Sequence, residues 1–140
     1  MSVVVMNVLK QWLLGKGFET IEAIDVTNCV VFGRTKTVFI NNNSTRENRL
    51  ISLLHEAGHV DIHMKRKRNR NRTISGISLN EQVKEIGRFT QKSKRRLIAV
   101  LTEEIDAWDK GWKIGRKLGI KISKRRYEII RIRALMTYTR

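Results

Sequence analysis

The residue pattern with the clearest chemical meaning is His55-Glu56-Ala57-Gly58-His59, which lies in an apolar run from Leu50 to Met64. On an α-helix, residues four apart lie on one face, so His55 and His59 can offer two imidazole nitrogens to one metal ion. A carboxylate beside such a pair can take a proton from an attacking water, as in zinc peptidases. We therefore expect Zn²⁺ bound by His55 and His59, with Glu56 as the general base.

A zinc site of this kind needs a third protein ligand. The downstream candidates are His63, Glu103, Glu104, Asp106 and Asp109. His63 lies two helical turns from His55, about 12 Å along the axis, so both rings cannot reach one ion. At helical spacing Glu104 has apolar or small neighbours, whereas Glu103 has charged ones. Because an uncompensated buried carboxylate is costly, Glu104 is predicted to point inward to the metal and Glu103 to be solvated. An ion pair between a buried Glu104 and an arginine is the structural alternative.

A family resemblance rests on these same residues. The segment H-E-x-G-H at 55–59 is followed by E-x-x-A at 104–107. With the helix–hairpin–helix order expected before them, these motifs resemble the ImmA/IrrE group of small zinc metallopeptidases, over roughly residues 1–120. The resemblance implies a zincin-like fold of the gluzincin type, with His55, His59 and Glu104 as metal ligands and Glu56 as base. The chain departs from the family pattern at Trp108-Asp109-Lys110-Gly111, and Glu104 follows His59 by 45 residues.

The elements that would position this site can be read along the chain. Residues 3–14 predict an amphipathic helix that ends at Gly15 and Gly17. Its expected buried positions are Val4, Leu9, Trp12 and Leu13. Residues 21–24 predict a short further piece. Two β-branched runs, 29–32 and 37–40, flank Gly33-Arg34-Thr35-Lys36 and predict a β-hairpin.

The remaining segments read as helices. Ser44 and Glu47 form a predicted capping box before the helix that carries the histidines. Gly58 leaves that helix open to close approach by another backbone. A short helix is expected from 79 to 89, a long one from about Ser93 to Leu118 that stops at Gly119, and a last one over about 123–138. The fold class expected for residues 1–140 is a single α+β domain, mainly helical, with a small hairpin or sheet packed beside the histidine helix.

The chain is strongly basic, with 29 Lys and Arg against 13 acidic residues and a net charge of +16. Such a field attracts polyanions, although a solvated surface is the simpler explanation. A basic segment covers 65–72, and it either continues the helix or forms a loop that touches phosphates. Its candidate substrate or nucleic-acid contacts, with His63, are Lys65, Arg66, Lys67, Arg68, Arg70 and Arg72.

Composition also limits the setting of the protein. No segment is long and apolar enough to span a membrane, so no membrane partner is expected. The chain has one cysteine, Cys29, which predicts a reducing compartment and a cytoplasmic location. Because Cys29 lies in an apolar run, it is expected to be a buried structural thiol.

The function expected from these observations is zinc-dependent hydrolysis of a peptide or protein substrate. An extended peptide could pair with the edge of strand 37–40, and His63, Tyr127 or an arginine could stabilise the oxyanion. The alternative is a non-enzymatic protein on a zincin-like scaffold that binds nucleic acid or nucleoprotein through segments 65–72, 92–96 and 113–126. A third reading combines the two in a protease that acts on DNA-bound substrates.

Overall fold

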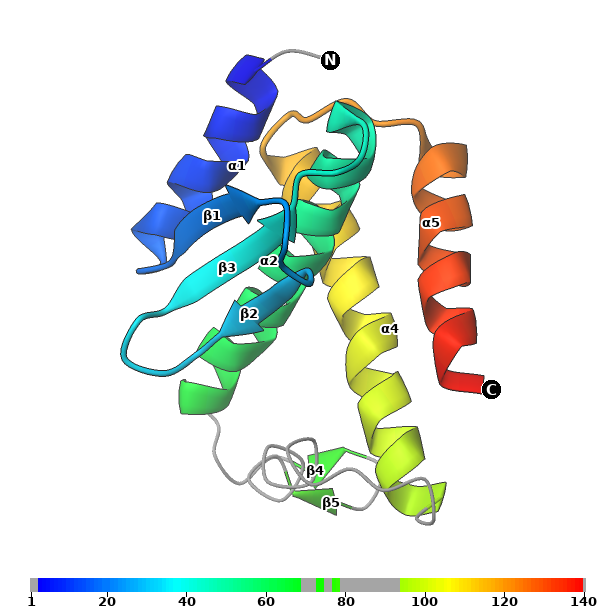
Figure 1. Ribbon diagram of the computed structural model, residues 1–140. Coiled ribbons are helices and arrows are strands. Elements are labelled where there is room, and N and C mark those ends of the chain that lie inside the picture. Colours follow the sequence, from blue (N-terminus) through cyan, green and yellow to red (C-terminus); the bar gives the residue numbers. More distant parts are fainter. Residues whose placement is uncertain (1–2, 69–72, 75–76, 79–93, 140) are drawn as a thin grey trace.

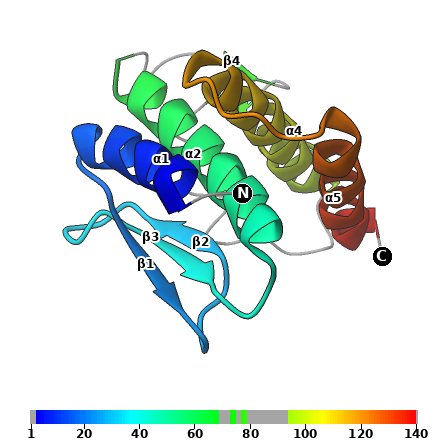
Figure 2. The same cartoon turned by 90° about the horizontal axis from the view of Figure 1, so that it is seen from above.

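The computed structural model describes residues 3–68, 73–74, 77–78 and 94–139. Within these ranges the chain is α+β, with four α-helices and a three-stranded mixed sheet as its main elements (Figure 1). The expected helix at 79–89 lies outside the described residues. Seen from above, α1 and the sheet lie on one side of α2, and α4 and α5 lie on the other (Figure 2).

Helix α1 (Val3–Gly15) packs its apolar stripe against the core, and Leu9 and Leu13 are fully buried. Val4 was expected among them but is 68% exposed, because it lies in the first turn beyond the edge of the core. The helix ends in a Schellman turn, in which Phe18 N donates to Leu13 O and Gly17 takes a φ of 89°. The predicted glycine stop is confirmed.

The sheet has the order β1-β3-β2, with β3 (Thr37–Asn41) in the centre. Strand β2 (Cys29–Val31) pairs with β3 in the predicted antiparallel hairpin. Strand β1 (Glu19–Ala23) pairs with β3 in parallel and accounts for the short piece expected at 21–24. The proposal that 37–40 offers a free edge is therefore wrong, because β3 has a neighbour on both sides. Within this sheet the edge strands are β1 and β2.

Helix α2 (Arg46–Arg68) runs through the middle of the fold. Its N-cap is Thr45, whose hydroxyl accepts from Asn48 N at 3.2 Å. The predicted capping box of Ser44 and Glu47 is wrong, and Glu47 instead pairs with Arg126 at 3.0 Å. The apolar flank of the helix is fully buried: Leu50, Leu53, Leu54, Ala57 and Val60. The basic stretch continues the helix as far as Arg68.

Helices α4 (Lys94–Lys117) and α5 (Lys124–Met136) complete the main architecture, followed by the 3-10 turn η1 (Thr137–Thr139). Gly119, at φ 72°, ends α4 in a second Schellman turn, which confirms the predicted stop. Ser123 is the N-cap of α5, close to the start expected for the last helix. Tyr127 buries its ring under α4. Together with the Arg126–Glu47 pair, this contact places the end of α5 and η1 beside the middle of α2.

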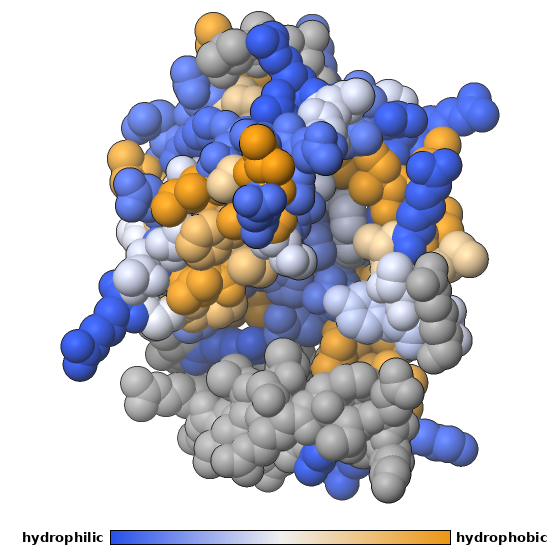
Figure 3. All heavy atoms as spheres, in the orientation of Figure 1, coloured by the Kyte–Doolittle hydropathy of each residue, from blue (hydrophilic) through white to orange (hydrophobic). Residues whose placement is uncertain are grey.

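Two short strands, β4 (Thr73–Ile74) and β5 (Ile77–Ser78), pair with each other antiparallel. Figure 3 shows a mainly hydrophilic face with apolar patches. Exposed apolar side chains on the sheet side include Ile21, Ile24, Val31 and Phe32. Among the helices that the structure describes, none has the length and apolar character needed to cross a membrane.

Candidate metal centre

The site forms where α2 and α4 come into backbone contact. A Cβ built on Gly58 would lie 1.9 Å from Ala107 O, and one on Gly111 would lie 2.4 Å from Leu54 O. Both distances are far below van der Waals contact, so only glycine permits this approach. The open face predicted at Gly58 is confirmed, and the backbone that uses it belongs to α4. This contact brings the side chains of residues 103 and 104 over the two histidines.

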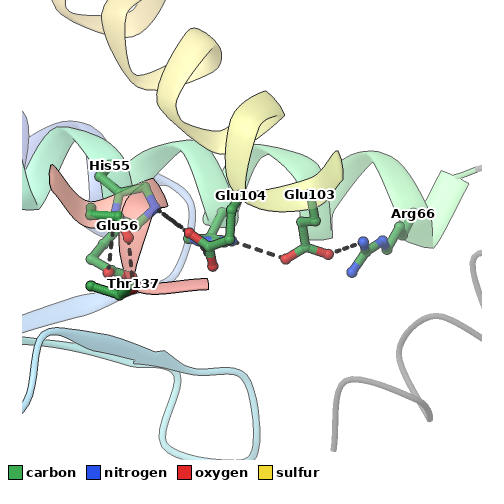
Figure 4. A network of polar contacts seen from close by, with 8 residues as sticks. His55, Glu56, Arg66, Glu103, Glu104 and Thr137 are labelled. Carbon is green, nitrogen blue, oxygen red and sulfur yellow. Dashed lines mark hydrogen bonds and ion pairs between the residues drawn. The ribbon is translucent and has the colours of Figure 1, made fainter. Parts of the chain in front are cut away.

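His55, His59 and Glu104 form a compact group that could hold a metal ion. Glu104 Oε2 lies 2.9 Å from His55 Nε2, and Glu104 Oε1 lies 3.2 Å from His59 Nε2. The two Nε2 atoms are 3.1 Å apart. Figure 4 shows Glu104 reaching from α4 to the imidazole of His55. The inward direction predicted for Glu104 agrees with this geometry, and no arginine takes the expected alternative place beside it among the described contacts.

The spacing of these atoms suits a tetrahedral ion. Zinc bonds of about 2.0–2.1 Å at tetrahedral angles place neighbouring ligand atoms about 3.3 Å apart. The two Nε2 atoms are 3.1 Å apart, and each lies 2.9 to 3.2 Å from a different oxygen of Glu104, so these separations are slightly shorter than that value. Two imidazoles and one carboxylate are also a usual donor set for zinc. The described group therefore needs only a small expansion to accept an ion between its members.

Glu56 lies next to this group and is only 5% exposed. Its Oε1 is 3.5 Å from His55 Nδ1, on the side of the ring away from Glu104. Burial, and more weakly the charge of Glu104, raise the pKa of Glu56, although the two histidines oppose this shift. A carboxyl group with a raised pKa can both accept and return a proton near neutral pH.

Glu103 is largely buried, whereas the sequence predicted that it would be solvated. Its side chain is 13% exposed, and its Oε2 lies 2.9 Å from His59 Nδ1. Arg66, also 13% exposed, forms an ion pair with the other carboxylate oxygen. The sequence pattern missed both partners because they lie on α2, across the helix contact. Figure 4 shows Arg66 directed at Glu103. This pair makes His59 Nδ1 the hydrogen-bond donor to Glu103 and leaves His59 Nε2 facing Glu104.

The site is electrostatically suited to a cation, because three carboxylates surround two imidazoles. Burial would lower the pKa of His59, but hydrogen bonds to Glu103 and Glu104 outweigh it and raise the pKa to about 10. Burial would likewise raise the pKa of Glu104, yet its bonds to His55 and His59 lower it well below the usual range. The site thus retains a proton on His59 that a bound metal ion would displace.

Aromatic residues fix the orientation of His55. The indole of Trp108 stacks on its ring at 4.2 Å with an interplanar angle of 6°. The Tyr127 hydroxyl donates to Trp108 O, so this candidate oxyanion donor is already committed and buried. The sequence departure at Trp108 and Gly111 therefore has a structural role. Trp108 packs on the ring of His55, a candidate ligand, and Gly111 permits the contact between α2 and α4.

The C-terminal turn supplies a residue that sequence reasoning missed. Tyr138 is half-buried, and its hydroxyl hydrogen-bonds Glu104. Burial, followed by the charge of Glu104, raises the pKa of Tyr138, so its hydroxyl keeps its proton at neutral pH. Its neighbour Thr137 lies beside Glu56 in Figure 4. Tyr138 lies 34 residues after Glu104 in a segment without a motif, so no sequence signal indicates this contact.

The residues predicted to contact substrate or nucleic acid lie in different surroundings in the structure. His63 stacks on Phe32 at 4.2 Å and is half-buried, away from the ligand group. Lys65 is exposed and pairs with Asp61, whereas Arg66 belongs to the metal centre through Glu103 and is not a free surface cation. Two residues, Lys67 and Arg68, continue α2, and Arg70 and Arg72 lie outside the described residues.

Cys29 is exposed, not buried as predicted, because it opens the edge strand β2. Partial burial and the charge of Glu56 raise the pKa of its thiol. The influence of Glu56 places the start of β2 near this carboxyl group. The raised pKa also makes the Cys29 thiol a weaker nucleophile at neutral pH than an unperturbed thiol.

Comparisons with known proteins do not assign a family. No family model matches the chain, and neither curated proteins nor solved structures gave a match. The resemblance to ImmA/IrrE peptidases therefore stays a prediction that rests on the residues of the site.

Proposed function

We propose that the protein is a zinc metallopeptidase with a zincin-like, ImmA/IrrE-like fold. The observation that carries this proposal is the convergence of His55 Nε2, His59 Nε2 and Glu104 within 3.2 Å of one another, with buried Glu56 beside them. Ligands of this type and geometry favour zinc over harder ions such as Mg²⁺ and Ca²⁺, which prefer oxygen ligands. When bound, zinc would polarise the scissile carbonyl and acidify a water molecule.

The protein's own groups supply the remaining chemistry. Glu56 takes a proton from the attacking water and returns it to the leaving amine. Tyr138 is the oxyanion donor in this proposal, because its protonated hydroxyl lies beside Glu104 and can turn toward the carbonyl oxygen. Glu103 and Arg66 keep His59 in the tautomer that presents Nε2 to the site.

The edge of β2 is the proposed binding surface for the peptide. Strand β2 pairs with β3 on one side only, and Cys29 at its start is near Glu56. An extended peptide that added to this edge would be held by main-chain hydrogen bonds, with little dependence on its side chains. This surface replaces the 37–40 edge that the sequence suggested.

Replacing Glu56 by Gln tests the catalytic role. The zinc-loaded variant should keep about one metal per chain by elemental analysis, because Glu56 is not a proposed ligand. Its cleavage of a fluorogenic peptide library should fall by at least about 100-fold, since general base catalysis contributes that much or more. Cleavage at the wild-type rate would exclude this role. Asp106→Asn is a matched control, because Asp106 is a carboxylate on the surface of α4 paired with Lys110.

A non-enzymatic nucleic-acid-binding protein is the second candidate, and the charge of +16 favours it. The two candidates differ in their response to a chelator. Peptide cleavage that a chelator abolishes supports the peptidase. Salt-dependent DNA binding that survives zinc removal, without any cleavage by the loaded protein, supports the alternative.

A further inference from the structure

A second feature of the surface is a hollow of about 270 Å³ formed by α1, α2 and α4. Five lysines line it: Lys65 on α2, Lys110, Lys113 and Lys117 on α4, and Lys16 in the turn that follows α1. Figure 2 shows that α2 lies between the other two helices. Asp61, at the wall of the hollow, is two residues after His59 and so about 200° around α2. The hollow and the metal centre therefore lie on different sides of this helix.

The charge around the hollow is only partly balanced. Lys65 pairs with Asp61 at 3.0 Å, and Lys110 pairs with Asp106 at 3.1 Å. Lys16, Lys113 and Lys117 form no ion pair with a carboxylate in the described part of the chain, and all three are exposed. Three uncompensated ammonium groups around one depression repel one another, and an anion bound there would relieve that repulsion.

The hollow also has an apolar side. Trp12 is half-buried and Ile114 is buried, and both line it. Lys16 Nζ lies 5.2 Å from the centre of the Trp12 ring, and this cation–π contact holds the ammonium group near the depression. The site thus combines flexible cations with an apolar wall, whereas a site for one small anion is usually built from converging backbone N–H groups.

We propose that this hollow binds the phosphodiester backbone of a nucleic acid. The cations come from α2, from α4 and from the turn after α1, and exposed Arg116, one helical turn after Lys113, adds a further cation on α4. A chain of phosphates can contact such an extended set, whereas a single phosphate reaches only a few of its members. Nucleic-acid binding here is independent of the metal centre and of peptidase activity.

The test is a fluorescence-anisotropy titration of a short labelled DNA duplex with the full zinc-loaded chain, over about 50 to 200 mM salt. The test variant replaces Lys16, Lys113 and Lys117 by Gln. The control variant replaces Lys124, Arg125 and Arg133 by Gln, which removes the same charge from exposed positions on α5. Circular dichroism and zinc content establish that both variants are folded and loaded.

Each phosphate contact contributes about 0.9 to the slope of log affinity against log salt, so the test variant should lose about 2 to 3 from the slope. The control should lose less than about 1. Equal losses in both variants would show attraction by net charge alone and overturn the proposal, as would absent binding by the wild type. Displacement of DNA by millimolar inorganic phosphate at constant ionic strength would indicate a small-anion site and also overturn it.

Discussion

Glu103 offers the sharpest test of how the metal centre is built. The sequence assigns it to solvent, which predicts normal zinc affinity when it is replaced. The structure instead places its carboxylate 2.9 Å from His59 Nδ1 and in contact with Arg66. Glu103→Gln keeps a carbonyl oxygen that can accept from Nδ1 but removes the negative charge. The variant should therefore bind zinc more weakly while retaining the ligand group.

The size of this effect follows from the arrangement. Loss of a carboxylate that orients a histidine ligand costs about 10- to 100-fold in metal affinity, which is about 1.4 to 2.7 kcal/mol. Arg66→Gln leaves Glu103 in place, so its effect should be smaller. Because the two residues act through one contact, the double variant should lose less than the sum of the single losses. Glu104→Gln removes a ligand and should exceed about 100-fold.

Competition with a chromophoric zinc chelator at fixed pH measures these affinities, and thermal melts of the metal-free proteins report on folding. Asp106→Asn serves as the control on the same helix, because its side chain is 44% exposed and pairs only with Lys110 in the described contacts. Unchanged affinity in Glu103→Gln would refute its positioning role. A loss equal to that of Glu104→Gln would show that Glu103 is itself a ligand.

Three further predictions concern the protons and the edges of the site. Zinc affinity should rise about tenfold per pH unit below pH 10, because a proton must leave His59, whose pKa is about 10, before zinc can bind. In the metal-free protein, charged His59 should stabilise the fold fully below pH 6.5, and this stabilisation should be lost as the pH rises through 10. Thermal melts across this pH range would measure the loss. Tyr138→Phe should lower kcat for peptide cleavage by about 10²- to 10³-fold with little change in zinc content, and an unchanged kcat would remove Tyr138 from the mechanism. Cys29, the sole cysteine, should react slowly with iodoacetamide at neutral pH, and a bound non-cleavable peptide should slow this reaction further. Mass spectrometry measures the reaction rate, and equal rates with and without peptide would argue against binding along β2.

The parts of the site that follow from short-range spacing were predictable from the sequence. His55 and His59 share a face because they are four residues apart, and Glu104 lies on an apolar stripe that must face inward. The stops at Gly17 and Gly119 follow from the same local reasoning, since a left-handed residue ends a helix.

The remaining features depend on contacts between distant segments. Glu103 looked solvated because its own helix offers charged neighbours, while its actual partners come from α2. Strand 37–40 looked like an edge because the hairpin fills one side, and the parallel partner β1 carries no turn signal that links it to β3. Tyr138 reaches the site only because α5 is anchored at its other end by Tyr127 and Arg126.

Gly58 on α2 and Gly111 on α4 determine how closely the two helices approach each other at the candidate metal centre. Alanine at residue 58 would place its methyl group 1.9 Å from Ala107 O, and α4 would have to retreat by about 1 Å to restore even a 3.0 Å contact. Metal–ligand distances usually lie within about 0.2 Å of their standard values, so a shift of α4 by about 1 Å would take Glu104 out of reach of an ion held by the two histidines. Because neither glycine carries a Cβ, α2 and α4 can approach closely, and this approach sets the distance between Glu104 and the histidines. A single methyl group added at Gly58 or Gly111 would therefore weaken or abolish the proposed metal site without changing any of its candidate ligands.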